Sequence, residues 1–159
     1  MEVYTVTEAK NNFPKLRRLA AKGNEFIVID HKRAETASVS VIATELLDKI
    51  TNEALANLTY EWLDQPGDRI TDDEMNQTWN LWNEQLQIHG VGTTKEEAIY
   101  SLAEDAVNYA NEYFDDLEFF LNPKSERDAH YWILRGIRYC DGDLTKVIMV
   151  MRLNELLEV

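Results

Sequence analysis

Hydrophobic and polar positions predict a small mixed module over the first fifty residues. The opening residues alternate as in a half-buried strand, and Thr7 is positioned to cap a short helix. Pro14 fits the first turn of a second helix, which Gly23 would end in a left-handed conformation. Two runs rich in β-branched residues follow and predict a hairpin. The predicted elements are a strand at 2–6, helices at 8–13 and 14–22, strands at 26–29 and 36–42, and a helix at 43–50.

The remaining hundred residues predict a second α+β unit. Thr94 and Glu97 form the pattern of a capping box, which opens a long amphipathic helix. Ser125 is placed to cap a further helix, and Asp143 to cap the last one. The predicted elements are a strand at 58–63, a hairpin at 79–92 turning near Asn83, and helices at 95–121, from Ser125 toward Tyr139, and at 144–157. The fold class is therefore α+β, with domains at 1–52 and 53–159.

Charge is distributed unevenly between these two parts. Residues 1–50 hold eight Lys and Arg against seven Asp and Glu, for a net charge of +1. Residues 51–159 hold eight against twenty-two, for a net charge of −14. Such asymmetry indicates one part that faces a polyanion and another that faces a basic partner. Because the whole chain carries −13, any contact with DNA must come from a local patch. Acidity that merely keeps the protein in solution would give the same composition.

Composition also limits the class of protein. The single cysteine, Cys140, excludes an intrachain disulfide and a thiolate metal cluster. The sequence contains no apolar run of the roughly 20 residues that span a bilayer, and its first residues lack the features of a secretory signal. We therefore expect a cytoplasmic protein without a membrane partner.

Three segments of the N-terminal third resemble the Phd/YefM family of antitoxins. They are Tyr4–Phe13, Gly23–Ile29 and Ala37–Val41, and they follow that family's order of a Thr-x-Thr-Glu-Ala-Lys opening, a helix ending near glycine and a hairpin. The resemblance implies a βααββα module that forms dimers and binds operator DNA, and a C-terminal part that binds and neutralises a toxin. Carried over by position, it also implies DNA contacts at Lys10, His31, Lys32 and Arg33. Asn11, beside Lys10, is a further candidate for a phosphate contact, and a solvated polar position explains it equally well.

The sequence departs from that family at the expected DNA contacts. The family's usual arginines are replaced by Lys10 and by the turn His31-Lys32-Arg33. Lysine lacks the planar guanidinium group that can donate two hydrogen bonds to one guanine base, and histidine is mostly neutral near pH 7. A solvated basic face would place the same residues in the same positions. DNA binding remains an expectation to be tested.

A shorter segment, Gly90–Ala98, is similar to the G-x-G-x-T-x-E-E-A pattern of HicB-type antitoxins, which use a partial RNase H-like fold. An ordinary β-hairpin packed on a helix would carry the same residues. The last predicted helix has more apolar positions than one narrow stripe requires. Core packing explains them, and so does a toxin-facing surface. The second interpretation assigns toxin contacts to Leu144, Val147, Ile148, Met151 and Leu156.

Residues suited to catalysis or metal binding occur without the neighbours that such chemistry needs. His31, His89 and His130 lie in unrelated contexts, and each is expected to be a surface or half-buried residue. Cys140 is expected to be a packed thiol. The carboxylates at 72–74 and 115–118 lack a glycine-punctuated calcium loop, so solvated faces are expected. We expect no enzyme activity, no metal and no cofactor.

The Phd/YefM resemblance, with which the charge distribution agrees, implies the antitoxin of a type II toxin–antitoxin system. Its partners would be a second copy of the chain, operator DNA and a basic toxin, either an RNase or an inhibitor of translation. The alternative is an orphan interaction module, in which the N-terminal fold serves dimerisation alone and does not bind DNA.

Overall fold

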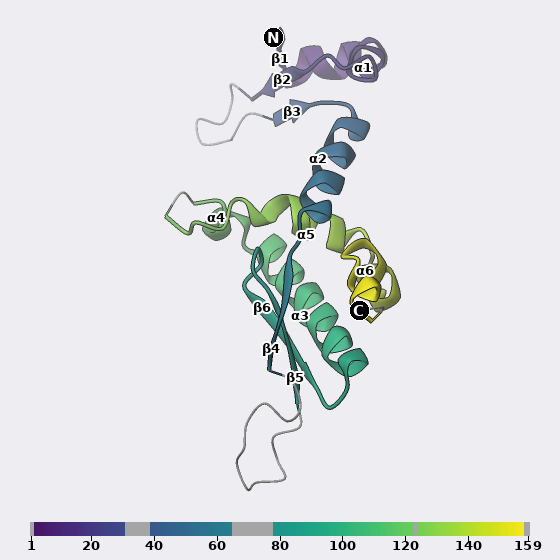
Figure 1. Ribbon diagram of the computed structural model, residues 1–159. Coiled ribbons are helices and arrows are strands. Elements are labelled where there is room, and N and C mark those ends of the chain that lie inside the picture. Colours follow the sequence, from purple (N-terminus) through teal and green to yellow (C-terminus); the bar gives the residue numbers. More distant parts are fainter. Residues whose placement is uncertain (1, 31–38, 65–77, 123, 158–159) are drawn as a thin grey trace, which may run out of the picture. The chain divides into compact units, whose positions relative to one another are not determined.

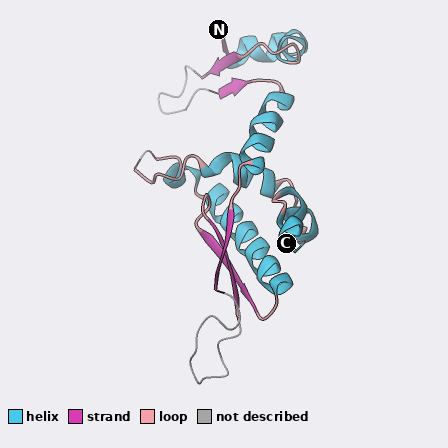
Figure 2. Cartoon of the chain, viewed as in Figure 1, coloured by secondary structure: helices cyan, strands magenta, loops and turns pink. Residues whose placement is uncertain are grey.

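The computed structural model describes residues 2–30, 39–64, 78–122 and 124–157 (Figure 1). The chain forms two compact units, Met1–Ile50 (unit 1) and Thr51–Val159 (unit 2). Each unit has its own three-stranded sheet, and helices account for most of the rest (Figure 2). The expected α+β class is confirmed.

Unit 1 is built on a strand–helix–strand crossover. Strand β1 (Glu2–Thr5) pairs in parallel with β2 (Phe26–Ile29), and helix α1 (Val6–Ala20) connects them. Strand β3 (Val39–Val41) pairs with β2 in the antiparallel direction. Helix α2 (Thr44–Ala56) follows and continues past the boundary between the two units.

The two helices expected before Gly23 are a single helix, so the predicted βααββα order is corrected to βαββα. The cap is Thr5 and not Thr7: Thr5 Oγ1 accepts from the Glu8 amide at 3.2 Å, and Glu8 accepts from the Thr5 amide at 2.8 Å. Pro14 lies inside the helix on its exposed side, where water can satisfy the carbonyl that proline leaves without an amide partner. The expected left-handed glycine is confirmed, since Gly23 has φ of +85°.

The core of unit 1 is small. Its buried hydrophobic residues in the described ranges are Ala9, Leu16, Ala20 and Phe26, with Tyr4, Val28 and Val41 packed around them. Helix α1 covers this face of the sheet, because Tyr4, Phe26 and Val28 point toward it. Four buried side chains, two of them alanines, provide little apolar area to stabilise a fifty-residue unit.

Unit 2 packs a helix on an antiparallel sheet of β4 (Tyr60–Asp64), β5 (Trp79–Asn83) and β6 (Ile88–Gly92). Helix α3 (Lys95–Asp115) runs along the sheet (Figure 1). Glycine at two positions of β6 permits this approach: a Cβ on Gly90 would lie 2.0 Å from the Ala98 carbonyl oxygen, and one on Gly92 would lie 2.5 Å from the Ala98 amide nitrogen. The expected hairpin over 79–92 is confirmed.

Only one of the two hydrogen bonds expected of the capping box at the start of α3 is formed as predicted. Thr94 Oγ1 accepts from the Glu97 amide at 3.1 Å, as predicted. The Glu97 carboxylate, however, accepts from the amide of Thr93 at 2.8 Å and from its hydroxyl. These hydrogen bonds from Thr93 lower the pKa of Glu97, so its charge stays in place near the positive end of the helix.

Helix α3 and the helices that follow it are shorter than the sequence predicted. The long helix ends at Asp115, because Asp116 leaves helical geometry and caps α4 (Leu117–Phe120). Helix α5 (His130–Arg138) begins after the residue expected to cap it, since the Ser125 hydroxyl donates to the carbonyls of Phe120 and Asn122 instead. Asp143 does cap α6 (Leu144–Val150), and Arg152, at φ of +59°, separates α6 from the 3-10 helix η1 (Leu153–Leu157).

Candidate functional site

The exposed face of α1 gathers the cationic side chains of unit 1. Its buried residues, Ala9, Leu16 and Ala20, define the face that packs on the sheet. With 3.6 residues per turn, one row of residues lies opposite this face and a second row lies on the flank of the helix. The opposite row holds Asn11, Lys15 and Arg18, with Lys22 in the following turn, and Lys10 and Arg17 lie on the flank; all of these residues are exposed.

The predicted DNA contacts divide between described and undescribed residues. Lys10 and Asn11 lie on the exposed face of α1. The neighbouring Asn12 is engaged within its own helix, because its side-chain amide donates to the Glu8 carbonyl at 2.9 Å. His31, Lys32 and Arg33 lie outside the described residues, so the structure places only part of the predicted set.

Sequence reasoning missed most of this cationic face. Lys15, Arg17 and Arg18 were not named as contacts, because the interpretation of Pro14 as a helix start divided α1 into two pieces. The spacing of Asn11, Lys15 and Arg18, opposite the buried Leu16, was the signal that would have found them. It becomes visible only when the helix is taken as continuous.

Unit 1 also exposes apolar side chains on its sheet and helix. Val3, Val6, Phe13 and Val39 are each more than half exposed. Val3 pairs with Ile27 on the face of the sheet opposite α1, since Tyr4 and Phe26 occupy the α1 side. Exposed apolar groups on a unit with so small a core are typical of a surface that another chain covers.

The residues proposed to contact a toxin belong to the core of unit 2. Val147 and Met151 are fully buried. Three others, Leu144, Ile148 and Leu156, are half-buried and packed against the same core. In this conformation the core interpretation of the last helix is the one that the structure supports. A toxin could reach Val147 or Met151 only if unit 2 opened.

His130 corrects the expectation of an ordinary surface or half-buried histidine. It is buried, and its Nδ1 lies 2.6 Å from the Tyr109 hydroxyl. Burial lowers the pKa of His130, with the nearby Arg127 as a further cause. Tyr113, which stacks on Phe120 in the same aromatic cluster, has its pKa raised to about 12 by burial. Burial in this cluster therefore favours the uncharged form of the His130 imidazole.

The buried His130 predicts that the protein loses stability as pH falls. Below about pH 6.5, the ordinary pKa of histidine, the unfolded chain binds a proton that the folded chain takes up only at lower pH. The free energy of unfolding should therefore decrease as pH is lowered from 7.5 to 5.5. His130→Gln should reduce this slope, measured by urea unfolding across a pH series. His89→Gln, at an exposed position of β6, should leave the slope unchanged; equal slopes in wild type and His130→Gln would contradict the prediction.

The other candidate residues are the carboxylate groups and Cys140. No group of three or more His, Cys, Asp or Glu side chains there is arranged to hold a metal ion. The carboxylates at 72–74 lie outside the described residues, and Asp115, Asp116 and Glu118 are exposed. Cys140 is buried, as expected, and burial raises the pKa of its thiol. No described helix combines the length and apolarity needed to cross a bilayer.

Comparison with known proteins identifies the family. A solved structure from Syntrophomonas wolfei subsp. wolfei, the antitoxin part of a candidate toxin/antitoxin system, has a similar fold: the TM-score is 0.56 and the identity 17%, over 95% of this chain and 94% of that chain. The family model described as antitoxin of toxin-antitoxin, RelE / RelB, TA system, matches residues 1–152. The chain therefore belongs to this antitoxin family. No curated protein matches it.

Family membership confirms the expectation of an antitoxin and indicates a toxin as its partner in general. The narrower Phd/YefM assignment and the HicB-type likeness remain resemblances of local sequence.

Proposed function

We propose that this antitoxin acts in a type II system, in which unit 2 binds and neutralises a basic toxin and a dimer of unit 1 represses its own operon. The observation that supports it best is the exposed face of α1. Lys15 and Arg18 lie opposite the buried side of this helix, Lys10 and Arg17 lie on its exposed flank, and Glu8, the acidic residue of α1, is engaged by Thr5. Such a face provides the local patch that a chain of net charge −13 needs to approach phosphates.

Exposed apolar residues of unit 1 support dimerisation. Val6 and Phe13 on α1, and Val3 on the far face of the sheet, are available for a second copy to cover, which would add apolar area to a core that is small in one chain. A symmetric pair presents α1 twice, so the operator should be roughly palindromic. His31, Lys32 and Arg33 remain part of the proposed contact surface.

The DNA-binding step is tested with duplexes from the region upstream of the gene. Lys15→Gln with Arg18→Gln should weaken binding at least about tenfold at 0.15 M salt, and should flatten the log–log salt dependence by about 0.9 for each phosphate that is no longer neutralised. The matched control is Lys124→Gln with Lys146→Gln, which removes the same charge from unit 2. Fluorescence anisotropy measures both quantities. Equal binding by the two double variants would exclude α1 from the interface.

Toxin neutralisation is tested separately by co-expression with the small open reading frames adjacent to the gene. The proposal expects that one of their products arrests growth alone and that this chain restores it. A dimer that rescues no neighbour and binds no upstream DNA would favour the alternative function, an interaction module that serves dimerisation only. The exposed Val3, Val6 and Phe13 favour dimerisation in both cases.

A further inference from the structure

The sheet of unit 2 has one face that α3 leaves uncovered. Leu81 and its cross-strand partners Trp62 and Gly90 point toward α3. Trp82 and its partners Glu61 and His89 therefore occupy the opposite face, because successive side chains alternate along a strand. Glu61 and His89 are exposed, and Trp82 is half-buried.

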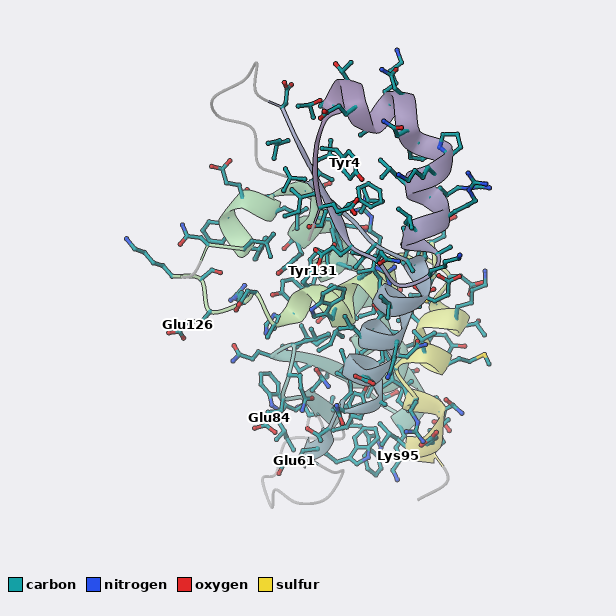
Figure 3. The ribbon with its side chains drawn as sticks, turned by 90° about the horizontal axis from the view of Figure 1, so that it is seen from above. Tyr4, Glu61, Glu84, Lys95, Glu126 and Tyr131 are labelled. Carbon is teal, nitrogen blue, oxygen red and sulfur yellow. The ribbon has the colours of Figure 1, made fainter. Side chains whose placement is uncertain are left out.

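A hollow of about 440 Å³ lies at the edge of this uncovered face. It is lined by Thr59, Tyr60, Glu61, Trp82 and Glu84. Glu61 and Glu84 lie near one another in this part of unit 2 (Figure 3). Glu61 and Trp82 are direct cross-strand partners, so a carboxylate and an indole ring stand side by side.

The hydroxyl groups of Tyr60 and Thr59, which line the hollow, are already engaged in hydrogen bonds. The Tyr60 hydroxyl donates to the Met151 carbonyl at 2.7 Å. Thr59 is bonded through its amide and its hydroxyl to the Gln85 side chain, at 2.9 and 2.7 Å. Within the described residues, neither Glu61 nor Glu84 makes an ion pair or a hydrogen bond. The charge that the described residues bring to the hollow is therefore negative.

The hairpin turn holds this arrangement in place before any ligand arrives. Asn83 is fully buried; its amide donates to the Thr59 carbonyl at 3.0 Å, and its oxygen accepts from the Leu86 amide at 2.9 Å. These hydrogen bonds tie the turn that carries Glu84 to the start of β4, next to Glu61. Preorganised groups bind with a smaller loss of conformational entropy.

We propose that this hollow, the Glu61–Trp82–Glu84 pocket, receives an arginine side chain of the basic toxin, and the proposal rests on the toxin-binding function proposed above. A guanidinium can stack on the face of Trp82 while its N–H groups donate to the two carboxylates. The same chain already uses this kind of interaction, since Lys95 lies 5.6 and 5.2 Å from the ring centroids of Trp62 and Trp79. The net charge of −14 on residues 51–159 attracts a cationic partner to this surface.

The pocket is tested on the full chain with an acetylated, amidated tetra-arginine peptide at 0.15 M salt. Binding should shift the NMR signal of the Trp82 indole N–H. Glu61→Gln with Glu84→Gln should weaken binding about tenfold, because the variant can no longer accept two charge-assisted hydrogen bonds. The matched control is Glu96→Gln with Glu104→Gln, which removes the same charge from exposed positions of α3 and should weaken binding less than twofold. An unshifted Trp82 signal, or equal weakening by both pairs, would overturn the proposal.

Toxin neutralisation distinguishes this proposal from the broader function. If wild type restores growth and Glu61→Gln with Glu84→Gln restores it equally well at matched expression, the pocket is excluded while the antitoxin function stands. If wild type restores growth against no neighbouring gene product, the proposed function fails, whatever the peptide does. A growth rescue that disappears in the pocket variant and persists in the α3 control supports both.

Discussion

Gly90→Ala is expected to destabilise unit 2 by about 3 kcal/mol or more, near the upper end of the cost of overpacking. The added Cβ would lie 2.0 Å from the Ala98 carbonyl oxygen and 2.5 Å from the Leu102 amide nitrogen. Both atoms belong to the backbone of α3, so no side-chain rotation relieves the clash. Helix and sheet would have to separate, which loosens the packing that organises the unit. Hydrogen exchange of α3 amides measures the destabilisation.

The control for this prediction is the next residue along β6. Val91 lies on the uncovered face of the sheet and is 40% exposed, so Val91→Ala should change the stability by no more than about 0.5 kcal/mol. If Gly90→Ala is as stable as Val91→Ala, the close approach of β6 to α3 is not a feature of the protein in solution.

Asn83→Leu is expected to cost about 3 kcal/mol, although the two side chains are similar in size. The substitution leaves the Thr59 carbonyl and the Leu86 amide without their partner, and each unpaired group costs about 1–3 kcal/mol when it is buried. Hydrogen exchange at Leu86 and denaturant unfolding both report the change. Glu84→Gln, in the same turn but exposed, should stay within about 0.5 kcal/mol of wild type. A fully stable Asn83→Leu would show that the turn does not depend on this amide.

The local sequence was enough to predict those helices and strands whose ends are determined by a few neighbouring residues. The hairpin of β5 and β6 follows from alternating positions around a short turn. Gly23 ends α1, and Asp143 begins α6, for reasons contained in a few neighbouring residues. For the same reason the α+β class was predictable.

The errors arose where tertiary packing outweighs a local signal. Pro14 was interpreted as a helix start, but the stripe of Ala9, Leu16 and Ala20 continues across it and packs on Phe26. Ser125 was interpreted as a cap, but its hydroxyl bonds backward to Phe120. Neither outcome is visible in a window of ten residues, because each depends on which surface the segment buries.

The candidate sites also differ in whether a local sequence signal or the folded structure reveals them. Lys10 was proposed as a DNA contact because its neighbours form a recognisable segment; it and Asn11 are exposed, and their contact with DNA stays a prediction. The Glu61–Trp82–Glu84 pocket was not found, since it depends on the register that pairs Glu61 with Trp82 across two strands. Asn83 was interpreted as part of a turn, although it is fully buried and joins the turn to β4. Register and burial of this kind are set by the folded sheet.

Helix α2 has a practical consequence for anyone who divides this protein by protease or by truncation. Thr51, on that helix, is buried and accepts a hydrogen bond from the Arg135 guanidinium at 2.7 Å, while Gly136 leaves room for Leu55 beside it. A fragment that begins at residue 53 lacks Thr51, so the buried Arg135 guanidinium loses a hydrogen-bond acceptor. A hydrogen bond to a charged group contributes about 1.5–3 kcal/mol to stability. A fragment that starts at Thr44 instead contains the whole of α2, including Thr51, the hydrogen-bond acceptor of Arg135.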